Sequence, residues 1–160
     1  MCKNWCFSWI FAFYYFWLCI TINFCEKKMI ANEIIKIASN TKNVGLTNNY
    51  SFKSILKNSL CGDKIKLELI VELSTIKSMK YETESCIYCE ASASLLAVKI
   101  KNLKIQTIIK DLNSLRNVIK NDKLIFPNNF KDFKKLINKR NYNRIKCINL
   151  PLEAVLKALK

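Results

Sequence analysis

The chain contains no histidine and only two glycines and two prolines among its 160 residues. Without histidine there is no Ser-His-Asp or Cys-His catalytic group and no zinc finger of the usual Cys/His kind. Two glycines are too few for a Walker loop or for the glycine-rich turn that binds dinucleotides. Acidic residues are scarce as well, because 12 Asp and Glu stand against 27 Lys and Arg, which gives a formal charge of +15. These absences exclude several large enzyme classes.

The positive charge has two readings. All but three of the basic residues are Lys, and Ile and Asn are also abundant, which is typical of AT-rich coding and a solvated lysine surface. A nucleic-acid surface would favour Arg with aromatic residues beside it. We therefore expect no nucleic-acid partner. A basic nucleic-acid-binding or membrane-tethered module is kept as the alternative of a different functional class.

The start of the chain is unlike the rest. No formally charged residue lies between Lys3 and Glu26, and ten aromatic residues fall in that stretch. A helix of about 20 apolar residues is long enough to span a bilayer. Residues 1–28 therefore predict a detached hydrophobic helix, and residues 4–25 are a candidate membrane anchor.

Three origins of this hydrophobic segment are open. Lys27 and Lys28 follow it directly, so a true anchor would leave the rest of the chain on the cytoplasmic side. Met29 is a natural start for a small domain, so residues 1–28 are alternatively a mis-called start, and a signal peptide is the third reading. In each of the first two cases we expect a single cytoplasmic domain over residues 29–160, with membrane contact only through residues 4–25.

Periodicity predicts strands first and helices afterwards. Residues 64–73 alternate apolar and charged side chains, which is typical of a strand with one buried face. A second strand is predicted over 75–83, joined to the first by a short turn and hence antiparallel, and 40–60 predicts a loop with one edge strand. Helices are predicted over 30–39, 90–99, 104–120 and 130–138, with a last one starting near Pro151. This order favours the α+β class.

Four cysteines lie outside the hydrophobic segment. Cys61 opens the motif Cys-Gly-Asp at the start of a strand, so Asp63 brings a carboxylate two residues from the thiol. Cys86 and Cys147 each precede a predicted helix, where the helix dipole lowers a thiol pKa. Thiols at three element ends can converge at one end of a small sheet and bind zinc or an iron–sulfur cluster. Cys89 is a possible accessory thiol, and each cysteine alone is alternatively a small buried hydrophobic residue.

Three motifs in order resemble the U-type iron–sulfur cluster scaffold proteins, the family of IscU, SufU and the N-terminal domain of NifU. The motifs are Cys-Gly-Asp at 61–63, a Cys followed by Ala-Ser-Ala-Ser within 86–94, and a Cys before Leu-Pro within 147–154. The resemblance covers roughly residues 29–160. It implies a small antiparallel sheet of about three strands with helices packed on one face.

The resemblance also implies a role, that of a scaffold and carrier rather than an enzyme. Such a protein accepts sulfur from a PLP-dependent cysteine desulfurase, assembles a transient cluster of the 2Fe–2S type and passes it to apo-proteins. Carried over by motif, Cys61, Cys86 and Cys147 are the thiolate ligands. Asp63 is the labile carboxylate ligand that keeps the cluster transferable, because a carboxylate is a harder partner for cluster iron than a thiolate. The alternative is a zinc-bound sulfurtransferase that uses the same ligands.

Departures from the family pattern indicate the subtype. Cys86 and Cys147 are 61 positions apart, which resembles the SufU-like branch with its insertion. Lys146 stands where the IscU branch has a histidine, and the Leu-Pro-Pro-Val-Lys motif is absent. Ser85 replaces the usual Gly, and Cys89 stands where the family more often has a small residue. We therefore expect the SufU/NifU-like branch, with Cys89 either capturing persulfide or having no role.

Overall fold

The computed structural model describes residues 32–121 and 125–160. The hydrophobic helix predicted within residues 1–28 lies outside this part of the chain, so that helix and its membrane role stay predictions. Residues Ile34–Lys160 belong to one folded unit. Within the described ranges, every helix is too short or too polar to cross a membrane.

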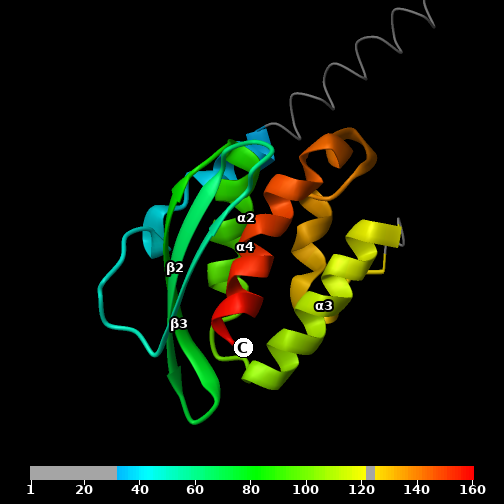
Figure 1. Cartoon of the computed structure of the whole chain (residues 1–160). Coiled ribbons are helices and arrows are strands. Elements are labelled where there is room, and N and C mark those ends of the chain that lie inside the picture. Colours follow the sequence, from blue (N-terminus) through cyan, green and yellow to red (C-terminus); the bar gives the residue numbers. More distant parts are fainter. Residues whose placement is uncertain (1–31, 122–124) are drawn as a thin grey trace, which may run out of the picture. The chain divides into compact units, whose positions relative to one another are not determined.

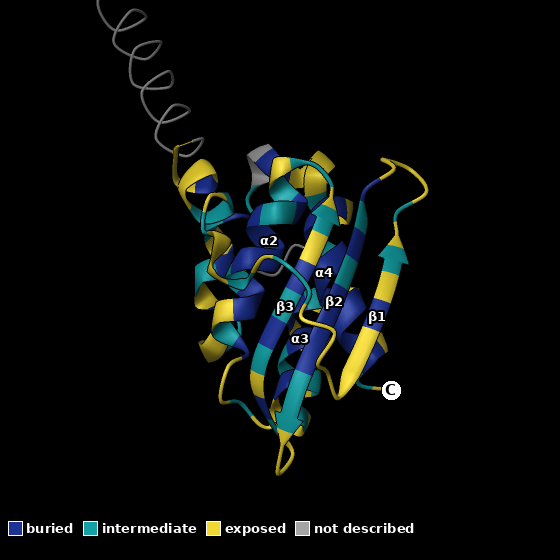
Figure 2. Ribbon diagram, turned by 90° about the vertical axis from the view of Figure 1, so that its left-hand side faces the viewer, coloured by how far each residue is buried: buried dark blue, intermediate teal, exposed yellow. Residues whose placement is uncertain are grey.

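Three antiparallel strands form the sheet in the order β1-β2-β3. They are β1 (Phe52–Lys57), β2 (Lys64–Glu72) and β3 (Thr75–Glu84). The alternation predicted for the central strand is confirmed, because Ile65, Leu67 and Leu69 are fully buried on one face. Figure 2 shows that β1 is mostly exposed at the edge of the sheet.

A tight turn joins β2 to β3, as predicted. Its two residues, Leu73 and Ser74, both have positive φ angles, of 47° and 61°. Two-residue hairpin turns of type I′ need this backbone, which normally selects Asn and Gly. The sequence offers neither residue, so the turn is held by the strand pairing on both sides rather than by its own preference.

The helices cover one face of the sheet, as expected. The long helices are α2 (Ile87–Lys99), α3 (Ile105–Asn121) and α4 (Ile145–Ala158). Short 3-10 segments are η1 (Thr41–Asn43), η2 (Asn128–Lys135) and η3 (Lys139–Arg144), and residues 32–38 are also helical. In Figure 1, α2 and α4 lie against the sheet, and α3 packs on α4 from the outside. The α+β class and the one-sided layering are therefore confirmed.

One helix start was predicted wrongly. The short helix predicted over 130–138 is present as the 3-10 helix η2, whereas the last helix begins at Ile145 instead of near Pro151. Pro151 lies inside α4, where its missing N–H leaves the carbonyl four residues earlier without its helical donor. The helix continues through Pro151 because the turn before it is held in the core, where Ile148 is fully buried. The Oγ–H of Ser92 on α2 donates to the Ile148 carbonyl at 2.7 Å, which fixes α2 to α4 there.

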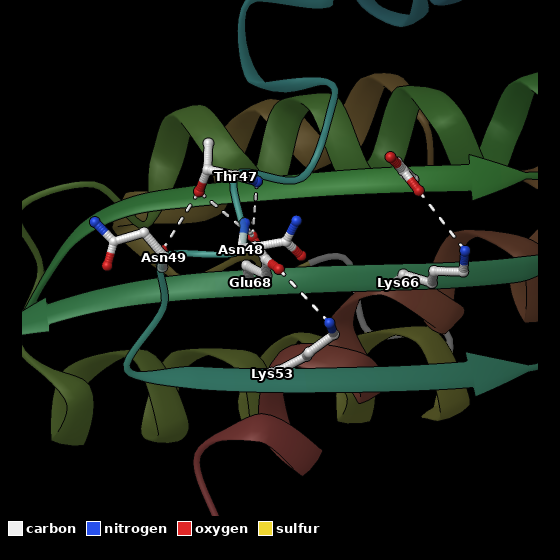
Figure 3. Close-up of polar contacts among 7 residues, drawn as sticks. Thr47, Asn48, Asn49, Lys53, Lys66 and Glu68 are labelled. Atoms are coloured by element: carbon white, nitrogen blue, oxygen red, sulfur yellow. Dashed lines mark hydrogen bonds and ion pairs between the residues drawn. The ribbon is translucent and has the colours of Figure 1, made fainter.

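The other face of the sheet is crossed by the segment that precedes β1 (Figure 3). Glu68 of β2 points to this face and is only 2% exposed. Its Oε2 accepts the backbone N–H groups of Thr47 and Asn48 at 2.9 and 3.1 Å. The Lys53 Nζ lies 3.7 Å from its Oε1. A buried carboxylate thus fastens the segment to the sheet, and its charge is balanced by backbone donors and one lysine.

Candidate metal centre

The turn between β1 and β2 points Cys61 outward and Asp63 inward. Gly62 has a φ of 76°, a conformation that favours glycine, and its N–H donates to the Asn58 carbonyl at 2.9 Å. Cys61 is exposed, whereas Asp63 is 5% exposed. The Cys-Gly-Asp motif therefore provides a thiol at the surface and a carboxylate below it.

Cys86 is the N-cap residue of α2, so it lies next to the helix start as predicted, although α2 begins earlier than residue 90. Its backbone N–H donates to the Asp63 Oδ1 at 3.0 Å. This bond links the first residues of α2 to the first residues of β2. The Cys86 thiol is half-buried beside the helix N-terminus.

Cys147 lies in the first turn of α4 rather than before the helix, because α4 begins at Ile145. It is almost fully buried, and its Sγ lies 3.6 Å from that of Cys61. The ligand atoms of Cys61, Asp63 and Cys147 all lie within 4.8 Å of one another. The Cys86 thiol is not one of these three, but it lies beside them and interacts with Asp63 and Cys147. Three segments far apart in sequence thus meet at one end of the sheet, and their role as ligands stays a prediction.

The surroundings of Asp63 favour the charged form of its carboxyl group. Burial raises its pKa, but the neighbouring thiols of Cys61 and Cys147, together with the amide and the thiol of Cys86, outweigh burial and hold the pKa below its usual value. Its other oxygen, Oδ2, is buried and has no directed hydrogen bond from the described residues. A buried carboxylate oxygen that lies close to two thiols is suited to serve as a metal ligand.

The Cys147 thiol has a raised pKa, chiefly through burial, with Asp63 adding to the effect. Without metal it is therefore a protonated thiol that donates toward Cys61 and Asp63. Only the thiolate ligates a metal, so metal binding at this site must release a proton.

Cys89 lies on the core side of α2 and is fully buried. Burial raises the pKa of its thiol to about 12, which keeps it neutral. The structure does not bring it into the group of ligand atoms. This placement favours a packing role over the capture of persulfide, which needs an accessible thiolate.

Two neighbouring polar residues were missed by sequence reasoning. The Tyr88 hydroxyl donates to the Asn141 Oδ1 at 3.1 Å, which connects α2 with η3 just ahead of Cys147. Glu90 contacts β3 through its side chain. An acidic residue in a first helical turn was the only sequence signal for Glu90, and no spacing rule reveals its partners, because they depend on how α2 packs against β3.

Two thiols and one carboxylate meet here, with the Cys86 thiol beside them, and such donors suit zinc or an iron–sulfur cluster. The side that holds Cys61 is open to solvent. The fold and site therefore define a small α+β protein with a candidate thiolate–carboxylate metal centre at one end of its sheet.

The family model of the NifU-like N terminal domain matches residues 29–160, and the chain belongs to this family. It is 27% identical over 135 residues to the "Iron-sulfur cluster assembly scaffold protein IscU" of Thermotoga maritima, which covers 84% of this chain and 94% of that protein. It is 33% identical over 70 residues to the "Zinc-dependent sulfurtransferase SufU" of Bacillus subtilis, a match over 44% of this chain and 47% of that protein. The predicted family is confirmed.

Solved structures share the fold. A NifU-like N-terminal protein from Brucella abortus has a TM-score of 0.72 at 20% identity, over 79% of this chain and 88% of that chain. A SUF-system scaffold protein from Fervidobacterium islandicum has a TM-score of 0.68 at 23% identity, over 79% of this chain and 93% of that chain.

Proposed function

We propose that this protein is an iron–sulfur cluster assembly scaffold. It accepts sulfur from a PLP-dependent cysteine desulfurase, assembles a labile 2Fe–2S cluster and transfers it to apo-proteins. The observation that carries this proposal is the meeting of Cys61, Asp63 and Cys147 within 4.8 Å, next to the start of α2. Membership of the NifU-like family supports it, as does the similarity to a protein named as an IscU scaffold.

The cluster is the cargo of the protein, and each residue of the site is assigned a different part in binding it. Cys61 is the exposed member of the set and is the first thiol that incoming sulfur can reach. Cys147, buried below it, retains the growing cluster together with Cys86. Asp63 supplies the exchangeable ligand, since carboxylates bind cluster iron less firmly than thiolates. The compartment that suits the free thiols of this site is the cytoplasm, where cysteines stay reduced.

A second candidate function is that of a zinc-bound sulfur acceptor of the same desulfurase. The similarity to a zinc-dependent sulfurtransferase favours it, and so does the number of donors, because three thiolates and one carboxylate complete a tetrahedral zinc site. Under this reading, Cys61, Asp63, Cys86 and Cys147 would hold the zinc, and the metal would keep their thiols deprotonated for the uptake of sulfur.

Anaerobic reconstitution with iron, sulfide and a cysteine desulfurase tests the scaffold function. The wild type should gain visible absorption with stoichiometric iron and sulfide, and Cys61→Ala, Cys86→Ala and Cys147→Ala should each lose most of it. Cys89→Ala is the matched control and should retain the cluster. A wild type that stays colourless, like all three variants, would refute the scaffold. Tightly bound zinc without iron in protein purified away from air would favour the sulfur-acceptor function.

A further inference from the structure

A second carboxylate lies behind the metal centre and takes no part in it directly. Glu90 sits in the first turn of α2, four positions after Cys86. Its Oε1 accepts the hydroxyl of Tyr81 at 3.0 Å, and its Oε2 accepts the hydroxyl of Thr83. Both hydroxyls belong to β3, so Glu90 is bound at both oxygens to the strand on which α2 rests.

The hydrogen bond from Tyr81 is well protected. Tyr81 is fully buried, and burial followed by the charge of Glu90 raises its pKa far above the usual range. The phenol therefore stays protonated and donates at every pH at which the protein works. Hydrogen bonds to a charged acceptor are roughly twice as strong as those between neutral groups, so this contact is a firm anchor for the helix.

A continuous series of hydrogen bonds leads from this anchor to the metal centre. The backbone N–H of Glu90 donates to the Cys86 carbonyl at 3.1 Å. The N–H of the same Cys86 donates to the Asp63 Oδ1 at 3.0 Å. Asp63 thereby has one oxygen bound to a backbone donor, while the other, Oδ2, is buried beside the thiols with no directed hydrogen bond from the described residues.

Release of Glu90 would remove the hydrogen bonds that join the first turn of α2 to Tyr81 and Thr83 of β3. Cys86 has no side-chain capping bond of its own, so these contacts help to fix the start of the helix beside the strand. The Cys86 amide would then move relative to Asp63, and the carboxylate would be free to turn and pair its second oxygen with a donor or with water.

We propose that Glu90 is a positioning residue of the metal centre: by binding Tyr81 and Thr83 it holds Cys86 against Asp63 and so sets the direction of the ligand oxygen. This inference rests on the proposed metal-binding function and adds a residue outside the ligand set. Partners that orient metal ligands typically change metal affinity by 10- to 100-fold when they are removed. We expect an effect of about this size.

Cobalt(II) is the probe, because thiolate-to-cobalt charge transfer reports the ligands directly. The folded protein, kept from air, is titrated with Co²⁺, and the metal is then withdrawn by a chelator. We expect Glu90→Ala to lower the Co²⁺ affinity and speed release by about 10- to 100-fold, with a changed absorption band at saturation. Glu90→Gln should recover much of the wild-type behaviour, because its amide oxygen still accepts the Tyr81 hydroxyl.

Two further variants complete the test. The first is a control for the removal of a carboxylate near the site, and the second tests the hydrogen bond to Glu90. Glu84→Ala removes an exposed carboxylate at the end of β3 whose ion partner is Lys64 at 3.5 Å, and it should bind Co²⁺ like the wild type. Tyr81→Phe removes one hydroxyl from the anchor and should weaken binding in the same direction as Glu90→Ala, by a smaller factor.

The outcomes separate the two proposals. If Glu90→Ala at saturation keeps the wild-type spectrum and release rate, Glu90 supports only the stability of the fold and the inference is wrong. The inference is also wrong if Glu84→Ala weakens binding as much as Glu90→Ala does. If the wild type itself gives no charge-transfer band, the metal-binding function fails and the inference falls with it.

Discussion

Substitution of Asp63 tests the site through both stability and cluster transfer. In the metal-free protein, Asp63→Ala removes the acceptor of the Cys86 amide, a hydrogen bond of 3.0 Å to a buried carboxylate. A hydrogen bond to a charged group contributes about 1.5–3 kcal/mol, and relief of the buried charge offsets part of this. We expect the free energy of unfolding to fall by about 1–2 kcal/mol at neutral pH. Asp63→Asn, which keeps an acceptor oxygen, should lose less.

The loss of unfolding free energy caused by these substitutions should depend on pH. The folded protein holds the pKa of Asp63 below its usual value, so the unfolded chain takes up a proton first as the pH falls. The stability that the carboxylate contributes is therefore fully present above its unfolded pKa and disappears as the pH falls through the lower folded pKa. Urea unfolding followed by circular dichroism should show the gap between wild type and Asp63→Asn narrowing below about pH 4. A gap that widens on acidification would refute this reasoning.

With a cluster bound, the same substitution should act in the opposite direction. Without its exchangeable ligand the cluster has no weak position at which an incoming thiol can enter. Asp63→Ala should therefore hold its cluster longer and transfer it more slowly to an apo iron–sulfur protein in an anaerobic assay. Faster loss of the cluster than in the wild type would contradict the role assigned to Asp63.

The remaining predictions concern the scaffold around the site. Ser92→Ala should lower the free energy of unfolding by about 1–2 kcal/mol, because its 2.7 Å bond to α4 is buried, whereas Ser94→Ala, which loses a 3.4 Å bond, should cost less. Replacing Leu73 by Asn and Ser74 by Gly should raise the melting temperature, since left-handed backbone costs a non-glycine residue about 1 kcal/mol or more; an unchanged or lower value would be contrary. Glu68→Ala should increase amide hydrogen exchange in the segment whose N–H groups it binds, and equal protection in both proteins would refute that anchor.

Local patterns were sufficient to predict the strands. The alternation over 64–73 defines the buried face of β2 without knowledge of any other element, because a strand with one covered face needs apolar side chains at every second position. The final helix shows where local rules fail. Pro151 suggested a start, yet α4 begins earlier, since burial of Ile148 and a bond from Ser92 outweigh the hydrogen bond that proline removes.

The sequence by itself determined the order of the elements and the residues of the candidate site, because Cys-Gly-Asp and the two later cysteines form motifs with local meaning. The tertiary structure decided which of them meet. It placed Cys61, Asp63 and Cys147 within 4.8 Å, left the Cys86 thiol beside them and buried Cys89 away from the opening. It also joined Glu90 to Tyr81 and Thr83 of β3. The physical reason is that hydrogen bonds between α2, the start of β2 and β3 join residues with no common spacing, so they exist only once the helix has packed against the sheet.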